Sequence, residues 1–488
     1  MVTPLVISYS GAQAWGDLQQ IAPTAIIAVA LLLAIVLDLV LPLPVRGVAS
    51  AAISVLGFIA AGAAAVYLVN RFHHPAYFGF ATGDNFAAYF DLLFCALGVL
   101  TVAVTHAYLG RRGFLQPEFY VLLLAASAGM MVMSSATSLV SVFLGLELLS
   151  VSLYVMSAFA RRDTRSQEAG VKYLLMGGFA SAFVLYGMAL TYGATGTTVI
   201  PTIAQRVTQG DTGNNLLLLG VVLMAIGFAF KVSAAPFQMW TPDVYQGAPL
   251  PVTAFMSVGT KAAAFAMILR VFAGGLPHLQ IEWQAALAFV AAASMIVGNL
   301  GAIAQSSVKR LLAYSGIAQA GYVLVGVLAG GPGNAAVLFY LFAYLFMNFG
   351  AFAIMVVLAG PEGDRDRLED LDGLGFSRPR LGVLMTLFML SLAGFPPTVG
   401  FIGKFFLFTA GVQSGFTWLV VLAVLMSVVS VYYYLRVVVH VWTPAPSGEE
   451  RPAVAPIAEI AIAISGALTI VLGILPMLVL NQVASASP

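Results

Sequence analysis

The residues of this sequence that offer chemistry are a few lysines and one glutamate that interrupt long apolar runs. The chain has 488 residues and 21 basic residues, of which only five are lysines, and four of the five lie inside apolar segments. Arginine cannot usefully release its proton in a protein, whereas the amine of a desolvated lysine can do so near neutral pH. A lysine at membrane depth is therefore a candidate proton carrier. The candidates are Lys231, Lys261 and Lys404, with Lys172 as a less secure fourth.

Lys261 is the clearest candidate, because it lies about twelve residues from either end of its apolar run, or ~18 Å along a helix. Its side chain cannot reach the membrane surface from that depth. A charged lysine at the centre of a membrane helix costs roughly 2.5 to 3.5 kcal/mol, which water, an acidic partner or deprotonation must offset. Lys231 and Lys404 each lie beside a helix-breaking proline, so we expect both amines to face an unwound, hydrated interior. The alternative is a buried pair that only holds helices together.

Four acidic residues are candidates to act with these lysines. Glu147, in "SVFLGLELLSVSLYV", lies deep in its apolar run. Lys172 either pairs with Glu147 or reaches back to the membrane interface, since it lies close to an arginine-rich loop. Asp38 and Asp91 fall near the ends of apolar runs, so helix packing and a part in a proton relay are equally open. Asp243, in "TPDVYQG", either caps a half-helix or feeds protons to the relay.

Membrane-spanning helices must position these side chains. Hydrophobic residues make up 61% of the chain and charged residues 8%, against roughly 25% charged in a soluble domain. The apolar runs are long enough to cross ~30 Å of hydrocarbon, and they predict fourteen spans between residues 21 and 480. We therefore expect an all-α polytopic membrane protein. A net charge of +1 gives no global field that would attract nucleic acid.

Two apolar segments, 214–247 and 380–413, are too long for simple spans, and each contains proline in its middle. Proline removes a backbone N–H and clashes with the carbonyl four residues earlier, so Pro236 should break the first segment, and Pro396 and Pro397 the second. These breaks lie 160 residues apart, which favours an inverted repeat of two five-helix units. The expected domains are 1–118 with three helices, 119–275 and 276–443 as the two repeats, and 444–488 with the last helix.

The basic residues predict an orientation, because cytoplasmic loops of membrane proteins carry an excess of arginine and lysine. With fourteen spans, only Arg71 and Arg206 fall in loops on one side, whereas thirteen basic residues fall on the other. Both termini should then lie on the non-cytoplasmic side. The thirteen are Arg46, Arg111, Arg112, Arg161, Arg162, Arg165, Lys309, Arg310, Arg365, Arg367, Arg378, Arg380 and Arg451.

Motifs for cofactor chemistry are absent from the sequence. It has no phosphate-binding Walker A loop, no dinucleotide fingerprint, no haem-attachment motif and no cluster of metal ligands. The sequence has one cysteine, Cys95, which excludes a disulfide framework. We expect its side chain to pack in the core or to face lipid. We therefore expect no cofactor and no covalent catalysis in this chain.

Several long strings resemble the antiporter-like subunits of respiratory complex I. The resemblance spans about residues 115–440, and within that family it is strongest to the bacterial N type of NADH:quinone oxidoreductase. The L type carries extra C-terminal spans, and the M type is expected to place glutamate where this chain has Lys404. The strings are "GLELLS", "VKYLL", "FKVSAAPFQMWTPDVYQGAPLPVTAF", "GTKAAAF", "KRLLAYSGIAQAGY" and "LAGFPPTVGFIGKF".

This resemblance implies a proton relay that is driven by redox chemistry in partner subunits. Glu147 and Lys172 would form an acid–lysine pair that receives the coupling signal. Lys231 would then accept a proton, Lys261 would connect two half-channels, and Lys404 would pass the proton outward. The resemblance also implies flavin, iron–sulfur clusters and quinone in partner subunits, neighbouring antiporter-like and small membrane subunits, surrounding lipid, and a bacterial inner membrane.

Other functions remain open on the sequence. A subunit of a multi-subunit cation/proton antiporter would use the same fold and the same lysines. A secondary solute carrier would also suit inverted repeats with broken helices, and would bind an organic substrate between the repeats. A structural membrane scaffold with inactive lysines is the third alternative.

Overall fold

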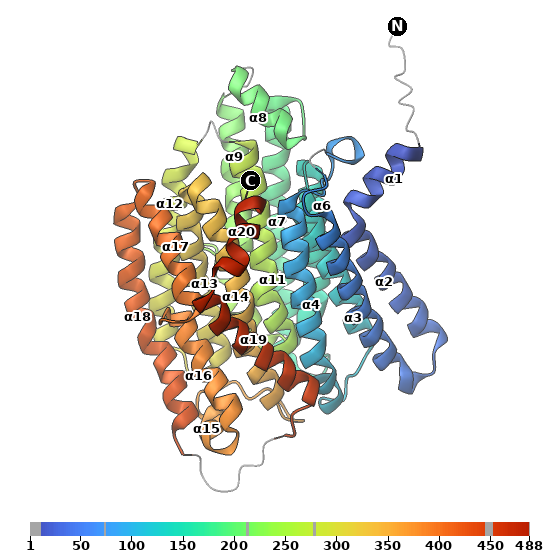
Figure 1. Ribbon diagram of the computed structural model, residues 1–488, viewed down its shortest axis with the longest axis vertical. Coiled ribbons are helices and arrows are strands. Elements are labelled where there is room, and N and C mark those ends of the chain that lie inside the picture. Colours follow the sequence, from blue (N-terminus) through green and yellow to red (C-terminus); the bar gives the residue numbers. More distant parts are fainter. Residues whose placement is uncertain (1–10, 73–74, 211–213, 277–279, 445–451, 488) are drawn as a thin grey trace.

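Long helices lie side by side along the long axis of the protein (Figure 1). The structure, a computed structural model, describes residues 11–72, 75–210, 214–276, 280–444 and 452–487. In these ranges the backbone is helical, with isolated bridges and no β-strand. The α-helices are α1 Gly11–Gln20, α2 Ala22–Val40, α3 Leu43–Leu68, α4 Asn85–Arg111, α5 Glu118–Ser135, α6 Leu139–Ser157, α7 Thr164–Thr195, α8 Ile200–Gln209, α9 Asn214–Lys231, α10 Trp240–Gly247, α11 Leu250–Ile268, α12 Gln280–Ile303, α13 Val308–Leu328, α14 Gly331–Leu358, α15 Leu374–Ser377, α16 Pro379–Ala393, α17 Val399–Gln413, α18 Thr417–Trp442, α19 Pro456–Ile474 and α20 Met477–Ala486.

Twelve helices in the described part of the chain are long and apolar enough to cross a membrane. The two proline-containing segments are not among the twelve, because each is divided into two shorter helices, α9 with α10 and α16 with α17. The protein is therefore all-helical and polytopic, as expected. The count of fourteen spans and the inverted repeat remain predictions.

The first break lies between the end of α9 at Lys231 and the start of α10 at Trp240. The peptide bond before Pro236 is cis, and Ser233 has φ of 64°, in the left-handed region that non-glycine residues rarely adopt. The hydroxyl of Ser294 on α12 accepts a hydrogen bond of 2.8 Å from a backbone N–H of the break. A side chain from another helix thus holds the unwound backbone.

The second break lies between the end of α16 at Ala393 and the start of α17 at Val399. Gly394 ends α16 with φ of 93°, a conformation that glycine adopts at little cost. The peptide bond between Pro396 and Pro397 is cis. This break is shorter than the first.

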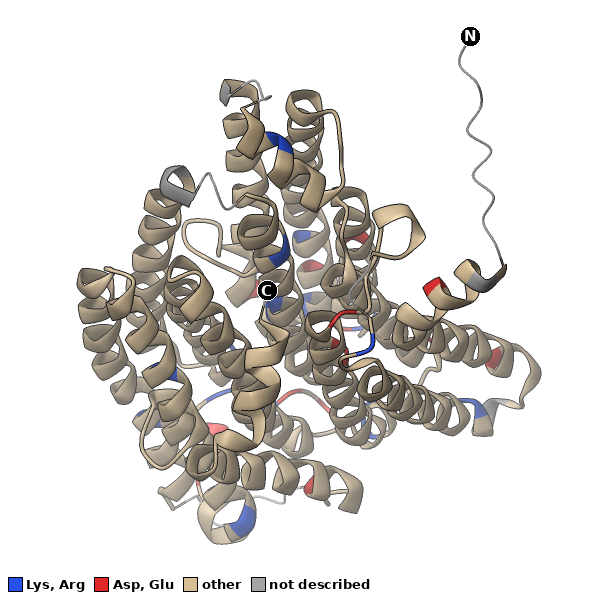
Figure 2. Ribbon diagram, turned by 45° about the horizontal axis from the view of Figure 1, so that its top comes forward, with Lys and Arg blue, Asp and Glu red and all other residues tan. Residues whose placement is uncertain are grey.

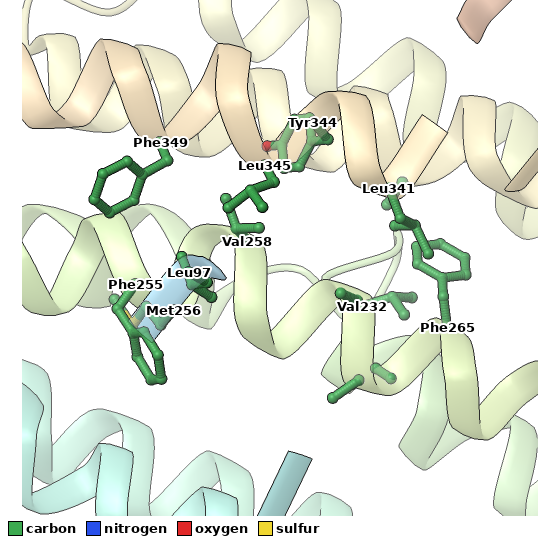
Figure 3. Close-up of a cluster of buried hydrophobic side chains, with 14 of the residues drawn as sticks. Leu97, Val232, Phe255, Met256, Val258, Phe265, Leu341, Tyr344, Leu345 and Phe349 are labelled. Carbon is green, nitrogen blue, oxygen red and sulfur yellow. The ribbon is translucent and has the colours of Figure 1, made fainter. Parts of the chain in front are cut away.

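Burial divides the helices into a central group and a peripheral group. The candidate spans that contain α11, α13 and α14 are 94 to 100% buried, whereas those of α2, α7 and α18 are only 22 to 33% buried. Figure 3 shows apolar side chains between α11 and α14, among them Val258 beside Leu345. The central group holds Lys261, and the peripheral helices present their apolar side chains outward.

Charged residues are sparse on the long helices (Figure 2). In Figure 1, α8, which carries Arg206, lies at one end of the bundle and α15, next to Arg378, lies at the opposite end. These positions agree with the separation of the two sets of basic residues that the sequence predicts. Residues 1–10 and Arg451 lie outside the described residues.

Candidate proton-relay site

Lys231 is the last residue of α9, and its side chain points toward α6. It is 3% exposed, and its amine donates a hydrogen bond of 2.7 Å to the hydroxyl of Ser150. Glu147 lies one turn before Ser150 on the same face of α6 and within electrostatic range of Lys231. Within the described residues, one buried carboxylate oxygen of Glu147 has no hydrogen-bond partner. The acid and the amine thus lie close together without a direct ion pair.

Lys172 does not form the predicted pair with Glu147. Its amine lies 2.7 Å from a carboxylate oxygen of Glu168, one turn earlier on α7, and 3.0 Å from one of Asp243. The side chain is 41% exposed, so Lys172 can reach a carboxylate at the edge of the bundle instead of the deeper Glu147. In this conformation the interfacial alternative fits Lys172 better than the buried pair.

Asp243 does not cap α10, so the capping alternative is wrong. The residue before α10 is Met239, which provides no side-chain cap, and Asp243 lies in the first turn of the helix. Its two oxygen atoms lie 3.0 Å from the amine of Lys172 and 2.7 Å from the guanidinium of Arg310. Asp243 therefore links α7, α10 and α13 through two cations.

Lys261 lies in the middle of α11, and every residue of that helix is buried. Lys261 is 2% exposed, and its amine donates to the carbonyl of Val232 in the first break, at 3.2 Å. The break frees this carbonyl because Val232 follows the last residue of α9. Lys261 is thus connected to the unwound backbone of the first broken helix.

Lys404 lies on α17 and turns back onto the end of α16. Its amine, on a side chain that is 5% exposed, donates to the carbonyls of Leu392 and Ala393, each at 3.0 Å, and to the hydroxyl of Ser427 at 2.9 Å. It also lies 5.0 Å from the centre of the Tyr322 ring. The second break therefore surrounds Lys404 with oxygen acceptors.

Hydroxyl and amide groups lie between the regions of Lys261 and Lys404, although the Tyr344 hydroxyl has no hydrogen-bond partner within the described residues. Tyr344 and Tyr340 lie one turn apart on α14, and their rings are stacked with centroids 6.4 Å apart. The Tyr340 hydroxyl donates to Gln319, whose amide donates at 3.2 Å to the carbonyl of Leu392, an acceptor that Lys404 shares. These groups could not be recognised from the sequence, because tyrosines in apolar helices are more often packing residues.

The remaining acidic candidates lie away from these lysines. Asp38 forms an ion pair of 3.5 Å with Arg46 near the end of α2. Asp91 is 4% exposed on α4, and one of its oxygen atoms has no hydrogen-bond partner in the described ranges. A residue pair not singled out from the sequence lies nearby, where Arg270 binds Asp84 through two hydrogen bonds of 2.6 Å. Asp84 also caps α4, so this pair has a structural role.

Lys309 lies in the first turn of α13, and the sequence indicates it only as a basic residue for orientation. Its side chain is only 2% exposed and forms an ion pair of 2.8 Å with Asp364. Its amine also donates at 2.8 Å to the carbonyl of Ala248, between α10 and α11. The sequence indicates this role only weakly: Lys309 is a lysine, whereas the other twelve basic residues assigned to the same side are arginines.

Comparison with known proteins gives a consistent result. Residues 136–430 match the family described as NADH:quinone oxidoreductase/Mrp antiporter, TM. NADH-quinone oxidoreductase subunit N of Trichlorobacter lovleyi is 45% identical over 475 residues, which cover 95% of this chain and 96% of the relative.

Solved structures share the fold over nearly the whole chain. A chain of respiratory complex I from Thermus thermophilus, solved with bound aureothin, has 38% identity and a TM-score of 0.82, and the match covers 95% of this protein and 99% of that chain. A chain of the Mrp complex from Dietzia sp. has a TM-score of 0.83 over 96% and 97% of the two chains, but at 22% identity it shows the fold alone. Together with the match over residues 136–430, these similarities show that the chain belongs to the NADH:quinone oxidoreductase/Mrp antiporter transmembrane family.

Proposed function

We propose that this chain is the proton-translocating membrane-arm subunit of an NADH:quinone oxidoreductase and moves protons outward through a relay of glutamate and lysine. The observation that carries the proposal is a set of three buried amines without an acidic partner. The structure forms no ion pair to Lys231, Lys261 or Lys404 within the residues it describes, although each side chain is at most 5% exposed. The relay also includes Glu147 and Lys172.

Buried amines of this kind are suited to proton transfer. A buried ammonium without a counter-charge is costly, so each amine must be neutral or be solvated by water when it is charged. These two states differ by one proton. A structural ion pair would instead favour the charged amine, and in the described residues Lys309 has such a partner in Asp364.

Glu147 is the group through which a neighbouring subunit can act on the relay. It lies within electrostatic range of Lys231, and the two share Ser150 as a neighbour. A change in the charge of Glu147 alters the free energy of the Lys231 ammonium. Lys172, which binds Glu168 and Asp243 at the edge of the bundle, joins the relay when its side chain moves from these acids toward Glu147.

Redox chemistry in partner subunits supplies the energy. Moving one charge against 100 mV requires about 2.3 kcal/mol, and we assign flavin, iron–sulfur clusters and quinone to those partners. The neighbouring antiporter-like and small membrane subunits would contact this chain. The location we propose is a bacterial inner membrane with both termini on the non-cytoplasmic side, fourteen spans, and two inverted repeats at 119–275 and 276–443 between a three-helix segment and a last helix.

The second candidate is a subunit of a multi-subunit cation/proton antiporter, which the fold of the Mrp chain favours. The identity of 45% to subunit N over 95% of this chain favours the oxidoreductase. Purification separates the two candidates. Co-isolation of this chain with flavin and iron–sulfur proteins supports the oxidoreductase, and co-isolation with membrane subunits that lack both cofactors supports the antiporter.

Replacement of Lys231 tests the relay. In the assembled complex reconstituted into vesicles, Lys231→Arg keeps the charge but cannot release the proton, so we expect proton transport per electron transferred to fall at least about tenfold. Arg71→Ala is the control, because Arg71 lies at the surface and contacts only the ring of Tyr67 in the described structure. Normal proton transport by Lys231→Arg in a fully assembled complex would exclude the relay.

A further inference from the structure

A groove opens on the outside of the bundle among α2, α5, α6 and α7, with α2 at the edge of the bundle (Figure 1). It has a volume of about 790 Å³. Its apolar wall includes Leu39, Val151, Val155 and Val171, and each of these side chains is at least half exposed. In a membrane, lipid or a partner protein must therefore cover this surface.

One end of the groove is charged. It is formed by Asp38 near the end of α2, Glu118 in the first turn of α5, and Arg161 just after α6. Asp38 uses one carboxylate oxygen for an ion pair of 3.5 Å with Arg46. Glu118 and Arg161 are exposed, and the structure forms no ion pair to either of them within the residues it describes. A cation and two carboxylates are thus available at the mouth of an apolar groove.

The length of the groove matches one leaflet of a membrane. Along α6 its wall runs from Val151 to Ala158, which is about 10 Å at 1.5 Å per residue. The hydrocarbon core is ~30 Å thick, so one leaflet contributes about half of it, whereas a helix that crosses both leaflets needs about 20 residues. The groove therefore fits a lipid better than a membrane-spanning partner helix. Leu144, farther along α6 and 60% exposed, stays available to a neighbouring subunit.

The charges at the mouth favour one kind of headgroup. A guanidinium group such as that of Arg161 binds a phosphate in a bidentate manner. The primary ammonium of an ethanolamine headgroup has three N–H donors, as a lysine has, and can donate to Glu118 and Asp38. A choline headgroup has no N–H donor. A glycerol headgroup leaves the lipid with a net negative charge beside two carboxylates, which is unfavourable.

We propose that this groove is a binding site for one phosphatidylethanolamine molecule in the leaflet at the arginine-rich end of the bundle. Arg161 binds the phosphate, and Glu118 with Asp38 accepts hydrogen bonds from the ammonium. The acyl chains lie along the exposed apolar side chains of α6 and α7 as far as Val151, one turn beyond Glu147. The site needs no part of the proton relay, so Lys231→Arg should bind this lipid normally.

Photocrosslinking of the assembled complex tests the site. The probe is a phosphatidylethanolamine with a photoreactive diazirine in one acyl chain, and the crosslinked peptides are identified by mass spectrometry. We expect crosslinks at α6 and α7 near Val155 and Val171, and unlabelled phosphatidylethanolamine should compete at least about tenfold better than phosphatidylcholine or phosphatidylglycerol. Equal competition by the three lipids would overturn the proposal.

Two substitutions separate the parts of the headgroup. Glu118→Gln should reduce the preference for phosphatidylethanolamine over phosphatidylcholine to about twofold or less, because the ammonium loses a charged acceptor. Arg161→Gln should weaken all three lipids, since all of them carry the phosphate. The control is Arg162→Gln, because Arg162 is the next residue but lines a separate cavity beside Arg112. Unchanged competition in both Glu118→Gln and Arg161→Gln would contradict the assigned contacts.

Val151→Trp tests whether lipid or a partner helix fills the groove. The larger side chain occupies the deep end, so we expect the crosslinks near Val171 to fall at least about fivefold while the complex assembles normally. Val421→Trp on α18 is the control, because Val421 is also 54% exposed but lies on another helix. If Val151→Trp alone detaches a neighbouring subunit, and the unmodified complex gives no crosslinks at α6 or α7, a partner helix fills the groove and the proposal is wrong.

Discussion

The two broken helices use their freed carbonyl groups in different ways. In the first break, the indole of Trp240 donates to the carbonyl of Phe230 at 3.0 Å and Lys261 donates to that of Val232. Lys231, at the break itself, is left to bind the hydroxyl of Ser150. In the second break, the two freed carbonyls at the end of α16 both accept from the one lysine of α17.

This difference separates two kinds of lysine. An ammonium group has three N–H donors. Among the described residues, Lys404 donates hydrogen bonds to three oxygen atoms of the protein, whereas Lys231 and Lys261 each donate to one. The second break therefore offers its lysine three acceptors, whereas the first offers each of its lysines one within the described residues.

Removal of Lys404 should have the largest effect. Lys404→Leu removes three hydrogen bonds of a buried amine, although Gln319 still donates to the carbonyl of Leu392 and Ser427 to that of Ala393. A hydrogen bond to a charged group contributes about 1.5 to 3 kcal/mol, so we expect loss of proton transport and a marked loss of intact complex. Lys261→Leu leaves only the carbonyl of Val232 without its donor. This variant should stop proton transport with a smaller loss of intact complex. Quantification of assembled complex in membranes, together with proton uptake by vesicles, distinguishes the two variants. Equal loss of complex would remove the distinction between the breaks.

Gly394→Ala should have the next largest effect. The residue has φ of 93°, and a Cβ atom would lie 3.1 Å from Cδ and 3.4 Å from Nζ of Lys404. The control is Gly415→Ala, because Gly415 has φ of 86° but nothing within 4 Å of a new Cβ atom. Both variants carry backbone strain of about 1 to 3 kcal/mol, but only Gly394→Ala displaces Lys404. We expect about tenfold slower proton transport for Gly394→Ala alone, and similar rates for both variants would contradict this role.

The positions of the breaks could be predicted from the sequence, because proline acts locally. Pro236 lies within the first break, and Pro396 and Pro397 lie within the second. The burial of the lysines could also be predicted from the sequence, because each lies within a long apolar run. Lys231 and Lys404 are both buried beside a break, although Lys231 turns away from the unwound backbone.

The partners of these side chains could not be predicted, because they depend on how helices pack. Nothing in the sequence predicts that Lys172 contacts Asp243, 71 residues away, or that Lys309 forms an ion pair with Asp364. The same holds for Gln319, which reaches the carbonyl of Leu392 from another helix. Spacing along one helix specifies a face, but the neighbour of that face is fixed only by the tertiary fold.

Removal of one hydroxyl acceptor from each lysine should slow proton transport more at the first break than at the second. Within the part of the chain that the structure describes, Ser150→Ala removes the one acceptor of Lys231, whereas Ser427→Ala removes one of three acceptors of Lys404. A hydrogen bond to a charged group contributes about 1.5 to 3 kcal/mol, so we expect at least about tenfold slower proton transport for Ser150→Ala. Ser427→Ala should be slower by about twofold or less, since two carbonyls remain. A larger effect from Ser427→Ala would mean that the three acceptors do not act together.

The smallest effect is expected at Ser233, where the first break uses a left-handed serine and the second uses Gly394. Ser233→Gly removes a Cβ atom from this conformation, which should raise the stability of the complex by about 1 kcal/mol, measured as a higher temperature of dissociation. Ser233→Ala is the control, because it keeps the Cβ atom and removes only a hydroxyl that has no partner within the described residues. Proton transport should stay normal in both, since Lys261 binds the carbonyl of Val232, which neither change alters. Slower transport by Ser233→Gly alone would show that the strained backbone itself positions that carbonyl for Lys261.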